Sequence, residues 1–141
     1  MAEQIGGARP WRTHRVFGHV LWDQDRVRSL CRAYVEQLGR GGVLFVDESG
    51  LSKKGEHSVG VARQYSGTAG RIDNCQVDMF LAYANECGHG LIDHRLYVPK
   101  DWLDDEHRRE SRIPADVAFA TQPAVARAMI AHALDASMPC A

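Results

Sequence analysis

The sequence predicts one domain of the mixed α/β (α+β) class, with a helix, three antiparallel strands and a second helix. Three observations support this class. Residues 24–38 and residues 123–136 each repeat apolar side chains at helical spacing, whereas residues 75–84 carry apolar side chains at every second position, as a strand does. The chain has 141 residues, which is enough for one hydrophobic core.

The first helix is predicted over residues 24–38, QDRVRSLCRAYVEQL. Asp23 is placed to act as its N-cap, because a carboxylate there can accept a hydrogen bond from a free N–H of the first turn. Three glycines in residues 39–42 end the helix. Its buried face follows the spacing i, i+3, i+4, i+7 and consists of Val27, Leu30, Cys31, Tyr34, Val35 and Leu38.

The strands follow the helix. Residues 43–46 are uninterruptedly apolar, which predicts a short strand that is buried on both faces. Residues 58–65 could be a strand, and residues 75–84 are strongly β-like. Residues 85–90, NECGHG, read as a hairpin loop that leads to a returning strand over residues 91–98.

The remainder predicts a surface stretch and a helix. Residues 100–112 form a mixed charge run, in which three consecutive acids at 104–106 resemble a solvated turn. Residues 114–119 could form one helical turn. Thr121 and Pro123 then begin the last helix, because proline is tolerated in a first turn. Its buried face is expected to contain Val125, Met129, Ala133 and Leu134.

Composition indicates an ordinary globular protein with a net charge of −1. No apolar run reaches the roughly 20 residues that span a bilayer, and the first residues lack the apolar middle of a signal peptide, so a cytoplasmic protein is expected. The N-terminal segment is locally basic through Arg9, Arg12 and Arg15. The four cysteines form no C-x-x-C pair and are expected to be reduced thiols.

Asp47 is the most informative candidate residue. It follows the apolar run in VLFVDESG, and ligand sites in α/β proteins gather at the carboxyl ends of strands. One acid cannot hold two metal ions, so the residues alone leave both a metal ligand and a solvated turn open. Glu48 should point to the opposite face of the strand.

Four basic residues follow closely: Lys53, Lys54, His57 and Arg63. Cationic side chains near a carboxylate suit a phosphate backbone, although a solvated loop has the same composition. His89, Asp93 and His94 do not have the spacing of a metal site, because Asp93 and His94 face opposite sides of a strand. Asp78 is expected to face outward.

The long run VDESGLSKKGEHSVGVARQYSGTAGRIDNCQV, followed by FLAYA and GHGLIDHRLYVPKDW, resembles the DDE transposases of bacterial insertion sequences, specifically the insertion-sequence 701 group. Two flanking segments are also similar to that group, namely WDQDRVRSLCRAYVEQLG before the long run and FATQPAVARAMI after it. The resemblance implies a partial RNase H-like fold. It also implies a helical segment at 1–40 and the N-terminal part of the catalytic domain at 41–141.

The resemblance further implies that Asp47 is the first catalytic aspartate and a ligand of Mg²⁺ or Mn²⁺. In complete relatives, two such ions held by three carboxylates activate a water or a DNA 3′-hydroxyl for attack on a phosphodiester. The partner would be DNA at the ends of an insertion element. Lys53, Lys54, His57 and Arg63 would contact it, and no membrane is implied.

The chain departs from the family pattern after its last helix. The second catalytic aspartate should end a fourth strand beyond that helix, and the glutamate should lie further on; neither is present. We therefore expect a truncated transposase that is inactive alone, with an unpaired sheet edge and exposed apolar surface. The alternative is a non-enzymatic module that binds DNA or an intact transposase and regulates it.

Overall fold

The structure is a computed structural model that describes residues 21–140. The locally basic N-terminal segment, with Arg9, Arg12 and Arg15, lies outside the described residues. In chain order the elements are α2 (Gln24–Glu36), β1 (Val43–Ser52), β2 (Ala62–Ser66), β3 (Arg71–Asn85), β4 (Gly88–Tyr97), the 3₁₀ helix η2 (Lys100–Leu103), α3 (Asp105–Ser111) and α4 (Gln122–Asp135). This mixed α/β architecture agrees with the predicted class and with a partial RNase H-like fold.

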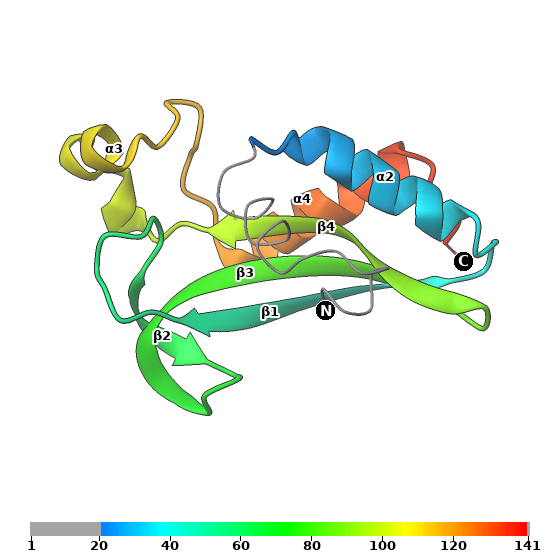
Figure 1. The fold of residues 1–141 in the computed structure, drawn as a ribbon, viewed down its shortest axis with the longest axis horizontal. Helices are drawn as coiled ribbons and strands as arrows, with labels where there is room; N and C mark the ends of the chain where they lie inside the picture. Colours follow the sequence, from blue (N-terminus) through cyan, green and yellow to red (C-terminus); the bar gives the residue numbers. More distant parts are fainter. Residues whose placement is uncertain (1–20, 141) are drawn as a thin grey trace, which may run out of the picture.

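One antiparallel sheet of four strands organises the chain (Figure 1). The long central strand β3 pairs with β1 along one side, from Val43 opposite Ala84 to Ser52 opposite Cys75. On its other side, β3 pairs first with β2 and then with β4. Four strands are therefore present: the possible strand at 58–65 is confirmed as the short β2, which makes four where the predicted class counted three.

The core lies between one face of the sheet and the helices α2 and α4. The predicted alternation in β3 is confirmed, since Val77, Met79, Leu81 and Tyr83 are all buried. The main cluster joins three of them to Val35 of α2, Ile92 of β4 and Met129 and Ala133 of α4. We call this the covered face of the sheet, and the opposite side the open face.

The prediction of a short, doubly buried first strand was wrong. β1 continues from Val43 through the acids to Ser52, because every one of its residues has a partner in β3. Val43 and Phe45 are 55% and 53% exposed, since their side chains lie on the open face, whereas Leu44 packs against the core. An apolar run thus forms a strand with only one covered side.

The other boundaries also needed correction. β2 begins at Ala62, because residues 59 and 60 form a turn; β3 begins at Arg71; and β4 begins at Gly88, so the predicted loop at 85–90 is mostly strand. Residues 114–119 contain no helix.

Helix predictions were right at the starts and less accurate elsewhere. Asp23 caps α2 by accepting a hydrogen bond from the N–H of Arg26 at 3.0 Å, and Thr121 caps α4. The acids at 104–106 do not form a solvated turn, since Asp104 is the N-cap of the helix α3. Half of the expected apolar stripe of α2 is exposed, namely Val27, Leu30 and Tyr34, and on α4 Leu134 is also exposed.

The buried hydroxyl of Tyr83 joins three segments of the covered side. It donates to the carbonyl of Gly39 at 2.6 Å and accepts from the N–H of Gly42 at 3.1 Å. It also lies 3.2 Å from the carbonyl oxygen of Pro139. Beyond this point Gly42 and Cys140 form an isolated parallel bridge, so the residues after α4 start to run beside β1.

The four cysteines, all within the described part of the chain, are free thiols, as expected. Burial raises the pKa of the Cys75 thiol, which keeps it protonated and unreactive. Among the described helices, none combines the length and the apolar character that crossing a membrane requires.

Candidate functional site on the open face of the sheet

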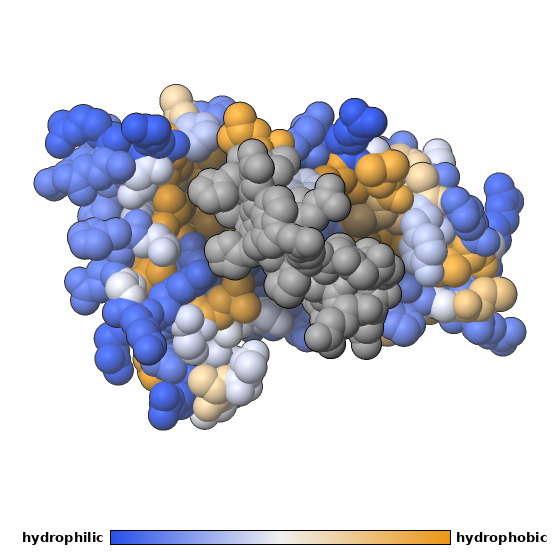
Figure 2. Space-filling view, in the orientation of Figure 1, coloured by the Kyte–Doolittle hydropathy of each residue, from blue (hydrophilic) through white to orange (hydrophobic). Residues whose placement is uncertain are grey.

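Antiparallel pairing places directly opposed residues on the same face, so the register defines rows across the open face. One row contains Asp47, Phe80 and His94, from β1, β3 and β4 respectively. The neighbouring rows are Phe45, Ala82 and Leu91 on one side, and Ser49, Asp78 and Leu96 on the other. Figure 2 shows hydrophobic patches at several places on the viewed face and a mainly hydrophilic surface at the end that carries α3.

Asp47 lies in the middle of β1 and is exposed. It was predicted at the end of a strand, but its pairing with Phe80 continues on both sides, so it does not form a turn. A strand holds a side chain more rigidly than a loop does, which suits a ligand. Glu48 faces the covered side, opposite Met79, as expected from the strand period.

Close packing explains why the motif DESG has a glycine at position 50. A Cβ at Gly50 would lie 2.5 Å from Oγ and 2.9 Å from Cα of Ser66. The buried Ser66 hydroxyl donates to the carbonyl of Gly50 at 3.3 Å. The end of β2 therefore packs directly on the backbone of β1, three residues after Asp47.

Two of the predicted cationic residues share the open face with Asp47. Arg63 of β2 is opposite Asn74 of β3, and Lys53 follows β1 on the other side of Asn74, donating its N–H to the Asn74 carbonyl at 2.8 Å. Lys53 is six residues from Asp47, which corresponds to about 20 Å along the strand. The open face thus has an acidic centre and a cationic corner, which we define as Lys53, Lys54, His57 and Arg63.

Side-chain amides hold the loop of the cationic corner against the sheet. The Asn74 amide donates to the carbonyls of Lys53 and Gly55 at 2.9 and 3.0 Å, and the Gln76 amide donates to the carbonyl of Val59 at 2.5 Å. Lys54 and His57 lie in this loop and are exposed. None of the four cations forms an ion pair with an acid of the described chain.

Arg71, a near neighbour of the corner, is different because it pairs with Asp73 at 3.3 Å. The hydrogen bond from the Asn74 backbone N–H is the main cause that lowers the pKa of the Asp73 carboxyl, and the bond from Arg71 lowers it further. Arg71 thus has an acidic partner within the chain, which Lys53 and Arg63 do not have among the described residues.

Asp93 is held by arginines and is not placed to bind a metal. Its side chain is fully buried on the covered face, and one oxygen accepts a hydrogen bond from Arg28 Nε at 2.5 Å. Arg32 and Arg95 approach the other oxygen at 3.6 and 3.8 Å. In the part of the chain that the structure describes, no three His, Cys, Asp or Glu residues form a group that could hold a metal ion.

Sequence reasoning missed Phe80, which is in direct register with Asp47, and the polar contacts of Tyr83 and Asp93. Phe80 and His94 lie with ring centroids 6.0 Å apart. The signal for Phe80 was present, because it is an aromatic residue at an outward position of the alternating strand 75–84. Nothing local indicated that Arg28 of α2 would meet Asp93, since 65 positions separate them.

Comparison with known proteins defines the class. The family model described as DDE superfamily endonuclease matches residues 1–141, so the chain belongs to the DDE superfamily of endonucleases. In an alignment of 99 residues that covers 67% of the chain, the chain is 33% identical to the probable transposase for insertion sequence element IS701 of Microchaete diplosiphon. That stretch covers 26% of the relative, so the chain spans about a quarter of its length. No solved structure matches the chain.

Proposed function

We propose that the open face is the DNA-facing surface of a transposase, with Asp47 as the first catalytic carboxylate and the cationic corner as its contact with backbone phosphates. The observation that carries the proposal is that the pairing register places Asp47, Lys53 and Arg63 on one uncovered face. Cations without ion-pair partners favour phosphate binding, since no internal carboxylate competes for them.

A divalent metal would supply the chemistry of phosphodiester cleavage in such a protein. The residues of this chain do not fit a two-metal centre by themselves, because such a centre needs several converging carboxylates. Asp47 has one acidic neighbour on its face, Asp78, which lies diagonally across β1 and β3. We therefore propose that the chain alone binds Mg²⁺ or Mn²⁺ weakly and does not cut DNA.

The bridge between Gly42 and Cys140 supports a place for the second carboxylate. The bridge is parallel and lies on the side of β1 that β3 does not use. Parallel strands advance at the same rise per residue. A strand that extended this pairing would run parallel to β1 toward Asp47, and the family resemblance expects the second aspartate at the end of such a strand.

The proposal is tested by the salt dependence of DNA binding. Each phosphate contact contributes a slope of about −0.9 to the plot of log affinity against log salt concentration. Loss of Lys53, Lys54 and Arg63 to alanine should therefore reduce the slope by up to about 2.7 units. Arg71→Ala is the matched control, because Arg71 is already paired, and it should change the slope little.

Equal slopes for the wild type and the triple variant would refute the assignment of the cationic corner. Metal binding is a separate measurement. Titration with Mn²⁺ should show weak binding to the wild-type chain and still weaker binding to Asp47→Asn. Tight Mn²⁺ binding that Asp47→Asn does not change would refute the role of Asp47.

A second candidate function is a non-enzymatic regulator that binds DNA or an intact transposase. The side of β1 that does not pair with β3 favours this second function. Beyond the Gly42–Cys140 bridge, this side has no strand partner among the described residues. An unpaired strand edge can accept a strand from another chain. Adding the chain to a complete relative should then reduce DNA cleavage by that relative. Unchanged cleavage at saturating chain would exclude this function.

A further inference from the structure

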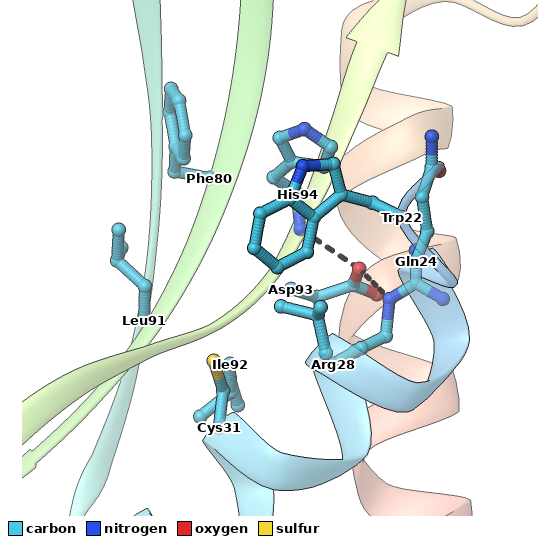
Figure 3. Close-up of a pocket in the computed structure, with 10 residues that line it drawn as sticks. Trp22, Gln24, Arg28, Cys31, Phe80, Leu91, Ile92, Asp93 and His94 are labelled. Atoms are coloured by element: carbon cyan, nitrogen blue, oxygen red, sulfur yellow. Dashed lines mark hydrogen bonds and ion pairs between the residues drawn. The ribbon is translucent and has the colours of Figure 1, made fainter. Parts of the chain in front are cut away.

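A cavity of about 330 Å³ lies between α2 and the sheet, at the β4 side of the Asp47 row (Figure 3). In Figure 3, Phe80 and Leu91 stand on the strands at one side, and Gln24, Arg28 and Cys31 project from α2 at the other. Ten residues line it: Trp22, Gln24, Val27, Arg28, Cys31, Phe80, Leu91, Ile92, Asp93 and His94.

The lining of the cavity is suited to a flat, uncharged ring. Its walls are mostly apolar and include the rings of Trp22 and Phe80. The two charged lining groups are Arg28 and Asp93, which are bonded to each other at 2.5 Å. The second Asp93 oxygen has Arg32 and Arg95 at 3.6 and 3.8 Å, so the Asp93 charge is already balanced by arginines. An anionic or cationic ligand would therefore find no counter-charge in this cavity.

Two further polar side chains line the cavity. The amide of Gln24 and the ring nitrogens of His94 form no hydrogen bond with described residues. The amide can both donate and accept a hydrogen bond, and the imidazole ring has two nitrogens that can form hydrogen bonds. A ligand with mixed donors and acceptors on its edge would match them, and a purely apolar ligand would leave them without partners.

The cavity is adjacent to the proposed catalytic residue. Phe80 is the direct partner of Asp47 on one side and of His94 on the other. Two strand spacings, about 10 Å in all, therefore separate Asp47 from the wall of the cavity that His94 forms. A nucleotide whose phosphate lies near Asp47 would have its base within reach of this cavity.

We propose that the cavity binds one unpaired nucleobase of the DNA strand that passes Asp47. A nucleobase is flat and uncharged and has donors and acceptors on its edge, which are the three properties that the lining requires. The proposal rests on the proposed function, because it assumes that DNA occupies the open face. It adds a preference for locally unpaired DNA and assigns it to residues of α2, β3 and β4.

The test compares two short DNA duplexes that contain 2-aminopurine, one with this base unpaired as a bulge and one with it paired to thymine. Stacking of one base on aromatic side chains is worth about 1–3 kcal/mol, so the wild-type chain should bind the bulged duplex roughly tenfold more tightly. The emission of 2-aminopurine should also change when the bulged duplex binds, because the base enters a new environment.

Two variants address the cavity. Leu91→Trp adds bulk to the lining at a position that is 56% exposed, and Gln24→Ala removes a polar group from the exposed first turn of α2. Both should reduce the preference for the bulged duplex. Leu134→Trp is the matched control, because Leu134 is 54% exposed on α4 and does not line the cavity.

The outcomes separate this proposal from the proposed function. Salt-dependent binding of both duplexes with no preference for the bulge, or a preference that Leu91→Trp and Gln24→Ala leave unchanged, would overturn the cavity assignment and leave the cationic corner intact. Absence of binding to either duplex at low salt would overturn both proposals. A preference that is lost in both variants and retained in Leu134→Trp would establish the site.

Discussion

Removal of the Tyr83 hydroxyl should destabilise the fold, because this hydroxyl is the hydrogen-bond acceptor for the N–H of Gly42, directly before β1 begins. In Tyr83→Phe, the N–H of Gly42 and the carbonyl of Gly39 lose their hydrogen bonds of 3.1 and 2.6 Å. Gly42 is buried and its N–H cannot reach water, whereas Gly39 is exposed and its carbonyl can. The cost is therefore mainly that of one buried, unsatisfied donor.

A buried donor without a partner costs about 1–3 kcal/mol, so we expect Tyr83→Phe to lower the free energy of unfolding by about 2 kcal/mol. For a chain of this size, the midpoint of thermal unfolding should fall by roughly 6 °C. The ring remains in place, so no cavity contributes to this value.

Urea denaturation measures the free energy of unfolding, and the dependence on urea should stay unchanged, since the same surface is exposed on unfolding. Tyr65→Phe is the control, because Tyr65 is exposed on the open face, and it should change stability by less than about 0.5 kcal/mol. Hydrogen exchange of the Gly41 and Gly42 amides should accelerate in Tyr83→Phe. A stability within about 0.5 kcal/mol of wild type would refute the role assigned to the hydroxyl.

Two further predictions concern the motif and the helix α3. Gly50→Ala should destabilise the chain by about 1–3 kcal/mol, because the new Cβ would lie within 3 Å of the Ser66 side chain and backbone. Gly67→Ala is the control and should be tolerated, because no atom lies within 4 Å of the new Cβ. Equal midpoints of unfolding for the two variants would contradict this reasoning. The hydrogen bond to Asp104 raises the pKa of His107 above 6.5, and the His107 backbone N–H lowers the pKa of Asp104 below 3.8. The contribution of the pair to stability should be lost as pH rises through the raised His107 pKa, and lost again as pH falls through the lowered Asp104 pKa. An NMR titration of Asp104→Asn should return the His107 pKa toward 6.5, and an unchanged value would exclude Asp104 as the cause.

The local features of this chain were predictable where chemistry within a few residues decides the outcome. The alternation in β3, the N-caps Asp23 and Thr121, and the opposite directions of Asp47 and Glu48 all follow from backbone geometry. The family was also evident from the ordered motif that begins at residue 46, and the family model that spans the chain confirms it.

Features that depend on partners distant in the sequence were not predictable. An apolar run has the same local pattern whether one or both faces are covered, so the exposure of Phe45 followed only from the positions of α2 and α4. The buried Asp93 reads as a surface acid until Arg28 is brought to it. Likewise, the acids that begin α3 gave no helical signal, because two or three turns of mixed charge have no apolar stripe.

The sequence by itself determined the strand period, the helix starts and the family, because these depend on near neighbours and on motif order. Only the tertiary structure decided which face of the sheet stays open. That choice depends on how α2 and α4 pack, and it places Asp47, Lys53 and Arg63 on one surface. The same packing brings α2 beside Phe80, where the cavity lies.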